Sequence, residues 1–254
     1  MTNSSKIALI TGSSRGLGRS MAQRLAADGT DVIVTYRQNR TEAEAAVAEV
    51  ERQDRRAVAL QLDVGDVRSF AGFAGRVQQA LAGRWQREQF DFLVNNAGVG
   101  VHAGFAETTE AQFDELMNVH FKGVFFLTQR LLPLLADGGR ILNVSSGLTR
   151  FSIPGYGTYA AMKGAVEVLT RYLAKELAPR GIAVNVLAPG AIATDFGGGV
   201  VRDDPGMNAM IAGLTALGRV GEPDDIGGAV AALLSPGANW VTGQRIEASG
   251  GMFL

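Results

Sequence analysis

Residues 11–18 read TGSSRGLG and directly follow a short apolar run, IALI, at residues 7–10. The three glycines, Gly12, Gly16 and Gly18, have the spacing G-x-x-x-G-x-G rather than the common G-x-G-x-x-G. Glycines between a strand and a helix permit a tight turn, and they let the backbone approach a pyrophosphate at the helix N-terminus. The stretch therefore predicts a strand–turn–helix unit that binds a dinucleotide. The alternative is a plain glycine-rich turn with no ligand.

Apolar runs and amphipathic stretches alternate along the rest of the chain. The expected strands are 7–10, 31–36, 57–62, 90–94, 140–144, 182–188 and 244–248, and the expected helices are 17–28, 41–54, 66–82, 110–135, 157–178 and 223–234. Most of the runs are continuously apolar, which is typical of parallel strands with helices on both faces. We predict a single domain over residues 1–254 with a doubly wound, Rossmann-type α/β fold of about seven parallel strands.

Local signals refine this prediction at three places. Thr41 with Glu44 has the pattern of a capping box, and Asp28-Gly29 has the pattern of a helix C-terminus. Segment 189–222 is rich in glycine and has no clear period. Long irregular segments are usually functional, so we expect a mobile substrate loop with one short helix there.

Composition narrows the range of functions. The chain has 254 residues, of which 46% are hydrophobic and 19% charged, and its net charge is −1. No overall charge attracts it to nucleic acid or to a membrane surface. It has no cysteine and only two histidines, His102 and His120, so we expect no metal site. Without an apolar run long enough for a membrane span or signal peptide, the sequence predicts a cytoplasmic protein.

The end of the second expected strand, VTYRQNR at 34–40, bears on the cofactor. An NAD site usually has an acidic residue here for the ribose 2′-hydroxyl, whereas this chain has Tyr36 and Arg37. Arg15, in the glycine turn, can reach the same place. Two guanidinium groups without a carboxylate suit a 2′-phosphate, which predicts NADP(H). The alternative is that both arginines are ordinary solvated surface residues.

Two further strand ends carry weaker signals. Asp63 ends the third strand and can either contact the adenine or cap the next helix. The sequence NNAG at 95–98 follows the fourth strand, where it forms either a backbone wall for a cofactor or a plain turn.

Residues 155–164, GYGTYAAMKG, contain two tyrosines and one lysine. Tyr159 lies four residues before Lys163, so the two side chains are neighbours on one helix face. Tyr156 is seven residues from Lys163, about 10 Å along a helix axis, and its neighbouring glycines place it before the helix. We expect Tyr159 to be the proton-transfer group, because a nearby ammonium group favours the phenolate and lowers the tyrosine pKa toward neutrality.

Taken together, these motifs resemble the short-chain dehydrogenase/reductase family over residues 6–251. The matching elements are Thr11-Gly12-x3-Gly16-x-Gly18, Asn95–Gly98, Asn118, Ser145-Ser146, Tyr159-x3-Lys163, Pro189-Gly190 with Thr194, and the C-terminal VTGQRIEASGG. Within the family the chain is most similar to 3-oxoacyl-carrier-protein reductases and related carbonyl reductases. The resemblance implies hydride transfer between NADP(H) and a carbonyl compound or secondary alcohol.

The family pattern also implies roles for individual residues. It implies a catalytic set of Asn118, Ser146, Tyr159 and Lys163. In this set Ser146 donates to the carbonyl oxygen, Lys163 also holds the nicotinamide ribose, and Asn118 anchors a water that relays protons to Lys163. On spacing alone Ser145 and Ser146 are nearly equivalent, and Asn118 is as consistent with a buried structural amide. The implied cofactor contacts are Gly12, Ser14, Arg15, Gly16, Leu17, Gly18, Tyr36, Arg37, Asp63, Val64, Asn95, Ala97, Gly98, Tyr159, Lys163, Pro189, Gly190, Ile192 and Thr194.

Several expectations remain less specific. An apolar substrate pocket is predicted from Ser146, Phe151, Ile153, Tyr156, Phe196 and Met210, which suggests a hydrophobic or aromatic carbonyl compound. His102, His120 and Lys122 are interpreted as surface or structural residues. Apolar residues on helices 110–135 and 157–178 suggest a subunit contact, and relatives usually form tetramers, so a homo-oligomer (tetramer or dimer) is expected.

Two other functions stay open. One is an enoyl reductase that uses Tyr156 to reduce C=C bonds, because the longer Tyr–Lys spacing resembles such enzymes. The other is an NADP(H) sensor without turnover, although a sensor would be expected to lose the Tyr–Lys–Ser–Asn set, and all four residues are present.

Overall fold

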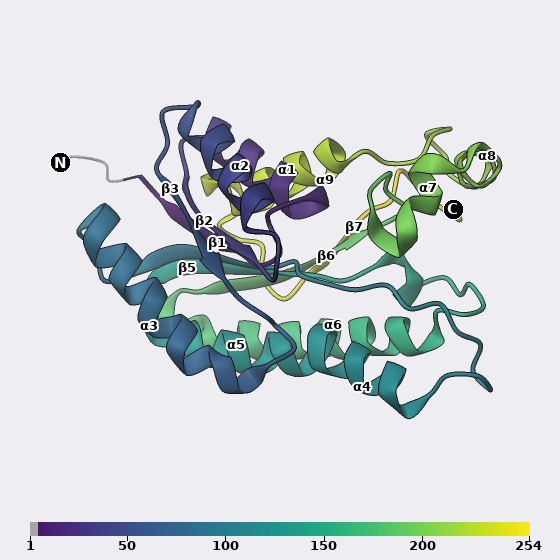
Figure 1. The fold of residues 1–254 in the computed structure, drawn as a ribbon, viewed down its shortest axis with the longest axis horizontal. Coiled ribbons are helices and arrows are strands. Elements are labelled where there is room, and N and C mark those ends of the chain that lie inside the picture. Colours follow the sequence, from purple (N-terminus) through teal and green to yellow (C-terminus); the bar gives the residue numbers. More distant parts are fainter. Residues whose placement is uncertain (1–4) are drawn as a thin grey trace.

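A computed structural model describes residues 5–254 of the chain, and a seven-stranded parallel sheet runs through its centre (Figure 1). Its strands are β1 (Ile7–Ile10), β2 (Asp31–Tyr36), β3 (Ala57–Gln61), β4 (Phe90–Asn95), β5 (Leu135–Val144), β6 (Ala183–Pro189) and β7 (Arg245–Ala248). Their order is β3-β2-β1-β4-β5-β6-β7, and every neighbouring pair is parallel. The predicted Rossmann-type fold is therefore confirmed.

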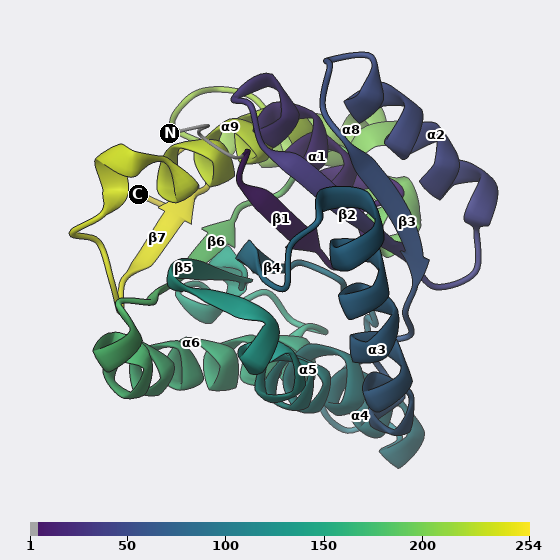
Figure 2. The same ribbon diagram turned by 90° about the vertical axis from the view of Figure 1, so that its left-hand side faces the viewer.

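Helices cover both faces of the sheet (Figure 2). One layer holds α1 (Gly16–Ala27), α2 (Arg40–Glu51) and α9 (Pro223–Leu234), and the other holds α3 (Phe70–Ala80), α4 (Glu110–Met117), α5 (Gly123–Leu131) and α6 (Gly157–Leu177). Two short helices, α7 (Val200–Asp203) and α8 (Pro205–Gly213), lie beyond the carboxyl end of β6. No helix within residues 5–254 combines the length and the apolar character needed to cross a membrane.

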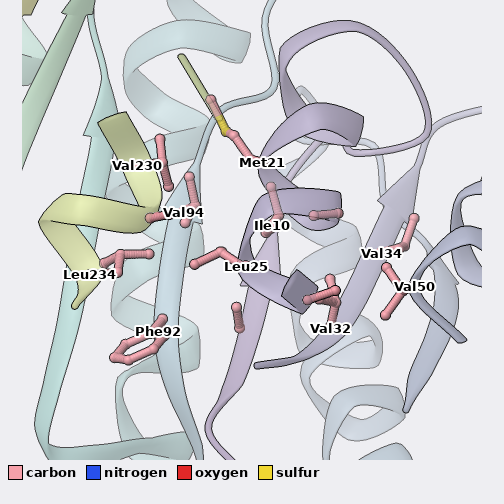
Figure 3. Packing of buried hydrophobic residues seen from close by; sticks show 14 of the residues in the cluster. Ile10, Met21, Leu25, Val32, Val34, Val50, Phe92, Val94, Val230 and Leu234 are labelled. Atoms are coloured by element: carbon pink, nitrogen blue, oxygen red, sulfur yellow. The ribbon is translucent and has the colours of Figure 1, made fainter. Parts of the chain in front are cut away.

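Two apolar cores hold the layers together, one on each side of the sheet. Successive side chains of a strand point to opposite faces, so Ile10 of β1 packs in one core with Met21 and Leu25 of α1 (Figure 3). Its neighbour Leu9 belongs to the other core, with Phe73 of α3. A strand buried on both faces needs the continuous apolar runs that the sequence contains.

Some local predictions were wrong. The N-cap of α2 is Asn39, whose side chain accepts from the Glu42 N–H, so Thr41 and Glu44 lie inside the helix and form no capping box. The expected helix 110–135 is broken by a π-helical turn at Asn118–Lys122 and ends at Leu131. The C-cap at Asp28 is confirmed, with Gly29 at φ 87°.

Segment 189–222 contains more helix than expected. It includes a 3-10 helix at Phe196–Gly199 followed by α7 and α8. Three successive glycines, Gly197 to Gly199, have positive φ, so the backbone of this segment departs from regular helix directly before α7. That this segment forms a mobile loop stays a prediction.

The strand order fixes where a ligand would bind. β1 lies between β2 and β4, so the direction of winding reverses there. In open parallel sheets, ligands bind beyond the carboxyl ends of the strands at such a switch point. The segments that leave this edge are the glycine turn after β1 and the NNAG sequence after β4.

Candidate active site

The glycine turn after β1 has the geometry of a dinucleotide cradle. Gly12 and Gly16 have φ of 64° and 54°, the left-handed region that favours glycine. A Cβ on Gly18 would lie 2.4 Å from the Gly12 carbonyl oxygen, so α1 packs this closely only with glycine at position 18. The three glycines therefore fit the predicted turn at the N-terminus of α1, where a pyrophosphate is favoured.

Asn96 fastens this turn to the end of β4. Its Nδ2 donates to the carbonyl oxygens of Thr11 (2.9 Å) and Gly12 (3.3 Å), and the Thr11 hydroxyl accepts from the N–H groups of Asn96 and Ala97. Asn96 was not among the predicted site residues. Its place in the NNAG sequence pointed to this edge of the sheet, but the sequence does not show which carbonyl oxygens its side chain binds.

Asn95 points the other way, into the core. It is 4% exposed, and its Nδ2 donates to Asn143 Oδ1 (2.8 Å) and the Thr128 hydroxyl (3.0 Å). Asn143 in turn donates to the Thr170 hydroxyl of α6 (2.9 Å). The Asn95 side chain thus braces β4 against β5 and α5, and its predicted cofactor contact stays a prediction.

The end of β2 carries the predicted phosphate-binding residues. Tyr36 is half-buried, whereas Arg37 and Arg15 are exposed. Arg15 also lies 3.7 Å from Asp195, so a carboxylate competes for this guanidinium group. Arg15 belongs to the glycine turn after β1 and Arg37 follows the neighbouring strand β2, and their predicted contact with a 2′-phosphate stays a prediction.

Other predicted cofactor residues lie around the same edge. Asp63 is exposed, and its Oδ1 accepts from the Gly65 N–H (2.9 Å). Asp63 caps this turn rather than a helix, because Asp66 caps the following 3-10 helix. Three more of these residues are half-buried: Ser14, Leu17 and Val64. Leu17 packs against the core that contains Ile10, and Val64 packs against the core that contains Leu9.

The end of β6 closes this edge from the other side. Gly190 cannot carry a side chain, because a Cβ would lie 2.8 Å from Ser249 Cα. Thr194 is 8% exposed and lies about 4 Å from the Cβ position of Gly16. Pro189 is buried, and Ile192 forms a parallel bridge with Gly221. Thr194 thus lies next to the glycine turn, as its predicted pyrophosphate contact requires.

Tyr159 and Lys163 lie one turn apart on α6, and both are buried. The Lys163 Nζ is 5.6 Å from the centre of the Tyr159 ring and donates to the Val144 carbonyl oxygen at 2.7 Å. This bond ties α6 to the carboxyl end of β5. Burial lowers the pKa of Lys163 to about 7, because the charged ammonium loses hydration.

The pKa of Tyr159 differs from the expectation. Burial raises the pKa of Tyr159 above the usual value of a tyrosine, and the Ser146 hydroxyl offsets only part of this effect. The prediction that Lys163 lowers the pKa of Tyr159 toward neutrality is therefore wrong for the protein by itself. The phenol is neutral at pH 7, which is the form that donates a proton.

The geometry around the two serines distinguishes them. The Ser146 hydroxyl accepts from the Leu148 N–H (3.2 Å), and it lowers the pKa of Tyr159. Ser145 is 3% exposed, and its hydroxyl donates to Glu167 Oε1 at 2.7 Å. Ser145 is thus occupied, and the arrangement supports the choice of Ser146 as the carbonyl-oxygen donor.

Tyr156 precedes α6, as expected, and serves as its N-cap residue. Its ring packs edge-on against His102 with centroids 5.0 Å apart, and a negative charge on Tyr156 would raise the pKa of Tyr159. The Phe196 ring lies 5.8 Å from the Tyr159 ring. Phe196 therefore lies beside Tyr159, whereas Tyr156 contacts His102.

The other predicted pocket residues are dispersed. The Phe151 ring packs against Phe253 with centroids 4.9 Å apart. Ile153 lines a separate cavity of about 440 Å³ with Phe105, and Met210 is 54% exposed on α8. Of the predicted apolar residues, the structure brings only Tyr156 and Phe196 close to Tyr159.

Asn118 and His120 share the π-helical turn between α4 and α5. Asn118 is half-buried, and its carbonyl oxygen accepts from the Gly123 N–H. Within residues 5–254, no hydrogen bond involves the Asn118 side chain. His120 is fully buried instead, with its ring 5.0 Å from the Tyr159 ring. The interpretation of His120 as an ordinary structural residue overlooked this contact with the reactive tyrosine.

This edge of the sheet thus carries the glycine turn and the buried Tyr159 phenol. Tyr159 can protonate an oxygen atom, Ser146 can hold that oxygen by a hydrogen bond, and Lys163 supplies positive charge. No group of three or more His, Asp or Glu side chains in the described part of the chain is arranged to bind a metal ion.

Comparison with known families gives a match over almost the whole chain. A family model described as enoyl-(acyl carrier protein) reductase matches residues 12–253. The chain is 36% identical to the 3-oxoacyl-[acyl-carrier-protein] reductase FabG of Staphylococcus aureus, covering 98% of each sequence. It is also 36% identical to the hydroxynaphthalene reductase-like protein Arp2 of Metarhizium brunneum, covering 97% of this chain and 94% of Arp2.

Solved structures give the same result. LugOII, described as a promiscuous reductase that catalyses keto-reduction at C1 in lugdunomycin biosynthesis, superposes with a TM-score of 0.93 at 40% identity, covering 98% of each chain. The angucycline C-6 ketoreductase LanV with bound NADP also gives 0.93, at 36% identity over 99% of this chain and 97% of LanV.

Proposed function

The chain belongs to the short-chain dehydrogenase/reductase family, and on this premise we propose that it is an NADPH-dependent ketoreductase. The reaction reduces a carbonyl group to a secondary alcohol, and it is reversible as an alcohol oxidation. The observation that carries the proposal is the buried Tyr159 phenol one helical turn from the buried Lys163 on α6.

The division of labour follows from the charges that develop. Bound NADPH supplies the hydride to the carbonyl carbon. The Ser146 hydroxyl donates a hydrogen bond to the carbonyl oxygen, which stabilises the growing negative charge. Tyr159 Oη gives its proton to that oxygen, and the buried Lys163 ammonium stabilises the phenolate that remains.

Chain residues also support the cofactor assignment. Gly12, Gly16 and Gly18 form the cradle, and Arg15 and Arg37 provide cations where an NAD enzyme would use a carboxylate. LanV, which has the same fold at 36% identity, binds NADP. We propose NADP(H) as the cofactor of this chain on these grounds.

We propose an aromatic or polycyclic ketone as the substrate class. The Phe196 ring packs beside Tyr159, Tyr156 precedes Tyr159 at the start of α6, and flat aromatic faces favour offset or edge-on ring contacts. Two relatives are described as ketoreductases of named natural products: LugOII acts at C1 in lugdunomycin biosynthesis, and LanV is an angucycline C-6 ketoreductase for which a structure with NADP and rabelomycin bound is known.

Enoyl reduction is the second candidate, because the matching family model carries that description. It would require Tyr156 as the donor. Tyr156 lies outside α6, however, and its ring contacts His102. Tyr159 lies one turn from Lys163 on α6, with the Lys163 Nζ 5.6 Å from the centre of its ring, which favours Tyr159 as the donor and therefore carbonyl reduction.

The test is to follow NADPH absorbance at 340 nm with matched substrate pairs. An aromatic ketone such as a tetralone would be compared with an α,β-unsaturated ester of similar size, and products would be identified by mass spectrometry and NMR. We expect a secondary alcohol from the ketone and no saturated ester. Saturation of the C=C bond with no ketone reduction would support the enoyl reductase instead.

We also propose a homo-oligomer formed through α5 and α6. Phe125, Phe126 and Tyr172 are 38%, 37% and 65% exposed, whereas Leu127 and Val166 are buried in the protomer and are unavailable to a partner. Light scattering after size exclusion would test this proposal, with Tyr172→Glu and Phe126→Glu expected to shift the mass to the monomer.

A further inference from the structure

His120 is the one residue whose buried polar atom lacks a partner among the residues described. The ring is 0% exposed and packs edge-on against Tyr159, with centroids 5.0 Å apart and planes at 84°. Its Nδ1 is buried and makes no hydrogen bond within residues 5–254. Buried polar groups are nearly always paired, so an orphaned nitrogen beside a proton donor requires an explanation.

The other ring nitrogen identifies the tautomer. Nε2 lies 2.7 Å from the Val99 carbonyl oxygen and 3.3 Å from the Val99 N–H nitrogen. One nitrogen cannot donate and accept at once, and the shorter contact has the geometry of the stronger bond. Nε2 therefore carries the proton and donates to the Val99 carbonyl oxygen, which leaves a lone pair on Nδ1.

The surroundings keep the imidazole neutral and in place. Burial and the nearby Lys163 ammonium lower the pKa of His120 to about 3. Gly98 leaves no room for movement on one side, because a Cβ there would lie 2.8 Å from His120 Cε1. The π-helical turn at Asn118–Lys122 carries His120 into this position between the NNAG segment and α6.

From this geometry we propose that His120 is a positioning residue of the proton relay, an inference that rests on the proposed ketoreductase function. Its ring holds Tyr159 in place by edge-on contact. Its Nδ1 lone pair accepts a hydrogen bond from an internal water that lies between His120 and Lys163. An unpaired acceptor next to an ammonium group is the kind of site that holds such a water.

The proton balance of the relay is simple. After Tyr159 protonates the alkoxide, the Lys163 ammonium returns a proton to the phenolate and becomes an amine. The water on His120 Nδ1 gives a proton to that amine, and it takes a proton from solvent in turn. His120 itself stays neutral throughout, because it acts only as an acceptor that orients the water.

This inference reassigns the role that the family resemblance implied for Asn118. Both residues lie in the same π-helical turn, and the ring of His120 packs against Tyr159. An amide oxygen and an imidazole lone pair are both neutral acceptors, so His120 can provide the same function. The sequence did not indicate this role for His120, because the family resemblance implies an asparagine and Asn118 lies only two residues before His120.

The first test reads the tautomer without turnover. The chain has two histidines, so in a His102→Gln background the only imidazole signals in a ¹⁵N-labelled sample belong to His120. We expect the neutral Nε2–H tautomer and no titration between pH 5 and 8. An Nδ1–H tautomer, or titration near the ordinary histidine value, would overturn the inference.

The second test compares three replacements in ketone reduction. His120→Asn keeps a donor for the Val99 carbonyl oxygen and an acceptor for the water, whereas His120→Leu keeps the volume alone. We expect His120→Leu and His120→Ala to lower kcat about 10- to 100-fold with less than about a threefold change in KM, and His120→Asn to retain most of the activity. Lys122→Ala, an exposed residue in the same turn, is the matched control.

The outcomes separate the two proposals. Equal activity of His120→Leu and His120→Asn would overturn the relay, as would a larger loss from Asn118→Ala than from His120→Ala. Failure of the wild type to reduce any ketone would contradict the proposed function, and the ¹⁵N measurement would then still decide the tautomer. Circular dichroism melting confirms that each variant is folded.

Discussion

Glu167 Oε1 accepts a hydrogen bond from the Ser145 hydroxyl at 2.7 Å and thereby joins the serine loop to α6. The same oxygen accepts from the Thr149 hydroxyl (2.7 Å) and from Arg245 Nε (2.9 Å). Glu167 lies one turn after Lys163 on the helix that also carries Tyr159. The Glu167 carboxylate therefore holds the loop that carries Ser146 next to α6, which carries Tyr159 and Lys163. Arg245 of β7 supports the same carboxylate from a third element.

We predict that Glu167→Ala lowers kcat for ketone reduction about tenfold and lowers the free energy of unfolding by about 1–3 kcal/mol, because three donors lose their acceptor. Glu167→Gln should give a kcat and a free energy of unfolding between those of wild type and Glu167→Ala, because its amide oxygen still accepts hydrogen bonds. Glu176→Ala, an exposed change on the same helix, is the control. Destabilisation by Glu167→Ala without any loss of kcat would show that the serine loop does not depend on this carboxylate.

The fold was predictable because each part of it depends on local pattern. The continuous apolar runs require strands buried on both faces, and the alternation of strands and helices leaves few topologies. The expected strands 7–10 and 31–36 agree with β1 and β2 residue for residue. The pair Tyr159 and Lys163 was predictable for the same reason, because helical spacing alone makes them neighbours.

The missed features depend on contacts between distant segments. Glu167 receives donors that are 18 to 78 residues away, and Asn96 binds carbonyl oxygens 84 and 85 residues away. The π-helical turn at 118–122 shifts the helical register by one residue, which changes the side chain that faces Tyr159. Periodicity arguments assume a regular helix and cannot detect such a shift.

The cofactor proposal predicts a selective effect of Arg37. Arg37→Ala should raise KM for NADPH about 10- to 100-fold, since a charge-assisted hydrogen bond contributes about 1.5–3 kcal/mol, and should leave kcat/KM for NADH unchanged. Arg40→Ala is the matched control, because Arg40 is exposed three residues away and pairs with Glu44. Steady-state kinetics with both cofactors measure the effect. An equal loss with NADH and NADPH would contradict the phosphate contact.

Lys163 should lower stability in a pH-dependent way. Its pKa in the folded protein is about 7, below the unfolded value of 10.5, so between these pH values the unfolded state binds more protons. The free energy of unfolding therefore rises as the pH increases from 7 to 10.5. The rise due to Lys163 is at most roughly 1.4 kcal/mol for each unit by which its folded and unfolded pKa values differ.

Lys163→Met removes this dependence. We expect the gain in free energy of unfolding of the variant over wild type to be largest at pH 6 to 7 and to disappear by pH 10. Ketone reduction by the variant should be abolished. Urea unfolding at four pH values measures the difference. A stability difference that is constant from pH 6 to 10 would contradict the lowered pKa of Lys163.

The most direct test compares the two tyrosines of the GYGTYAAMKG stretch. Kinetics of aromatic ketone reduction by NADPH would be measured for wild type, Tyr159→Phe and Tyr156→Phe, with NADPH binding followed by fluorescence. We predict that Tyr159→Phe lowers kcat about 100- to 10,000-fold with NADPH binding preserved, because the proton donor is lost. Tyr156→Phe should chiefly raise KM for the ketone. Undiminished turnover by Tyr159→Phe, with the loss found in Tyr156→Phe instead, would contradict the assignment of Tyr159 as the proton donor.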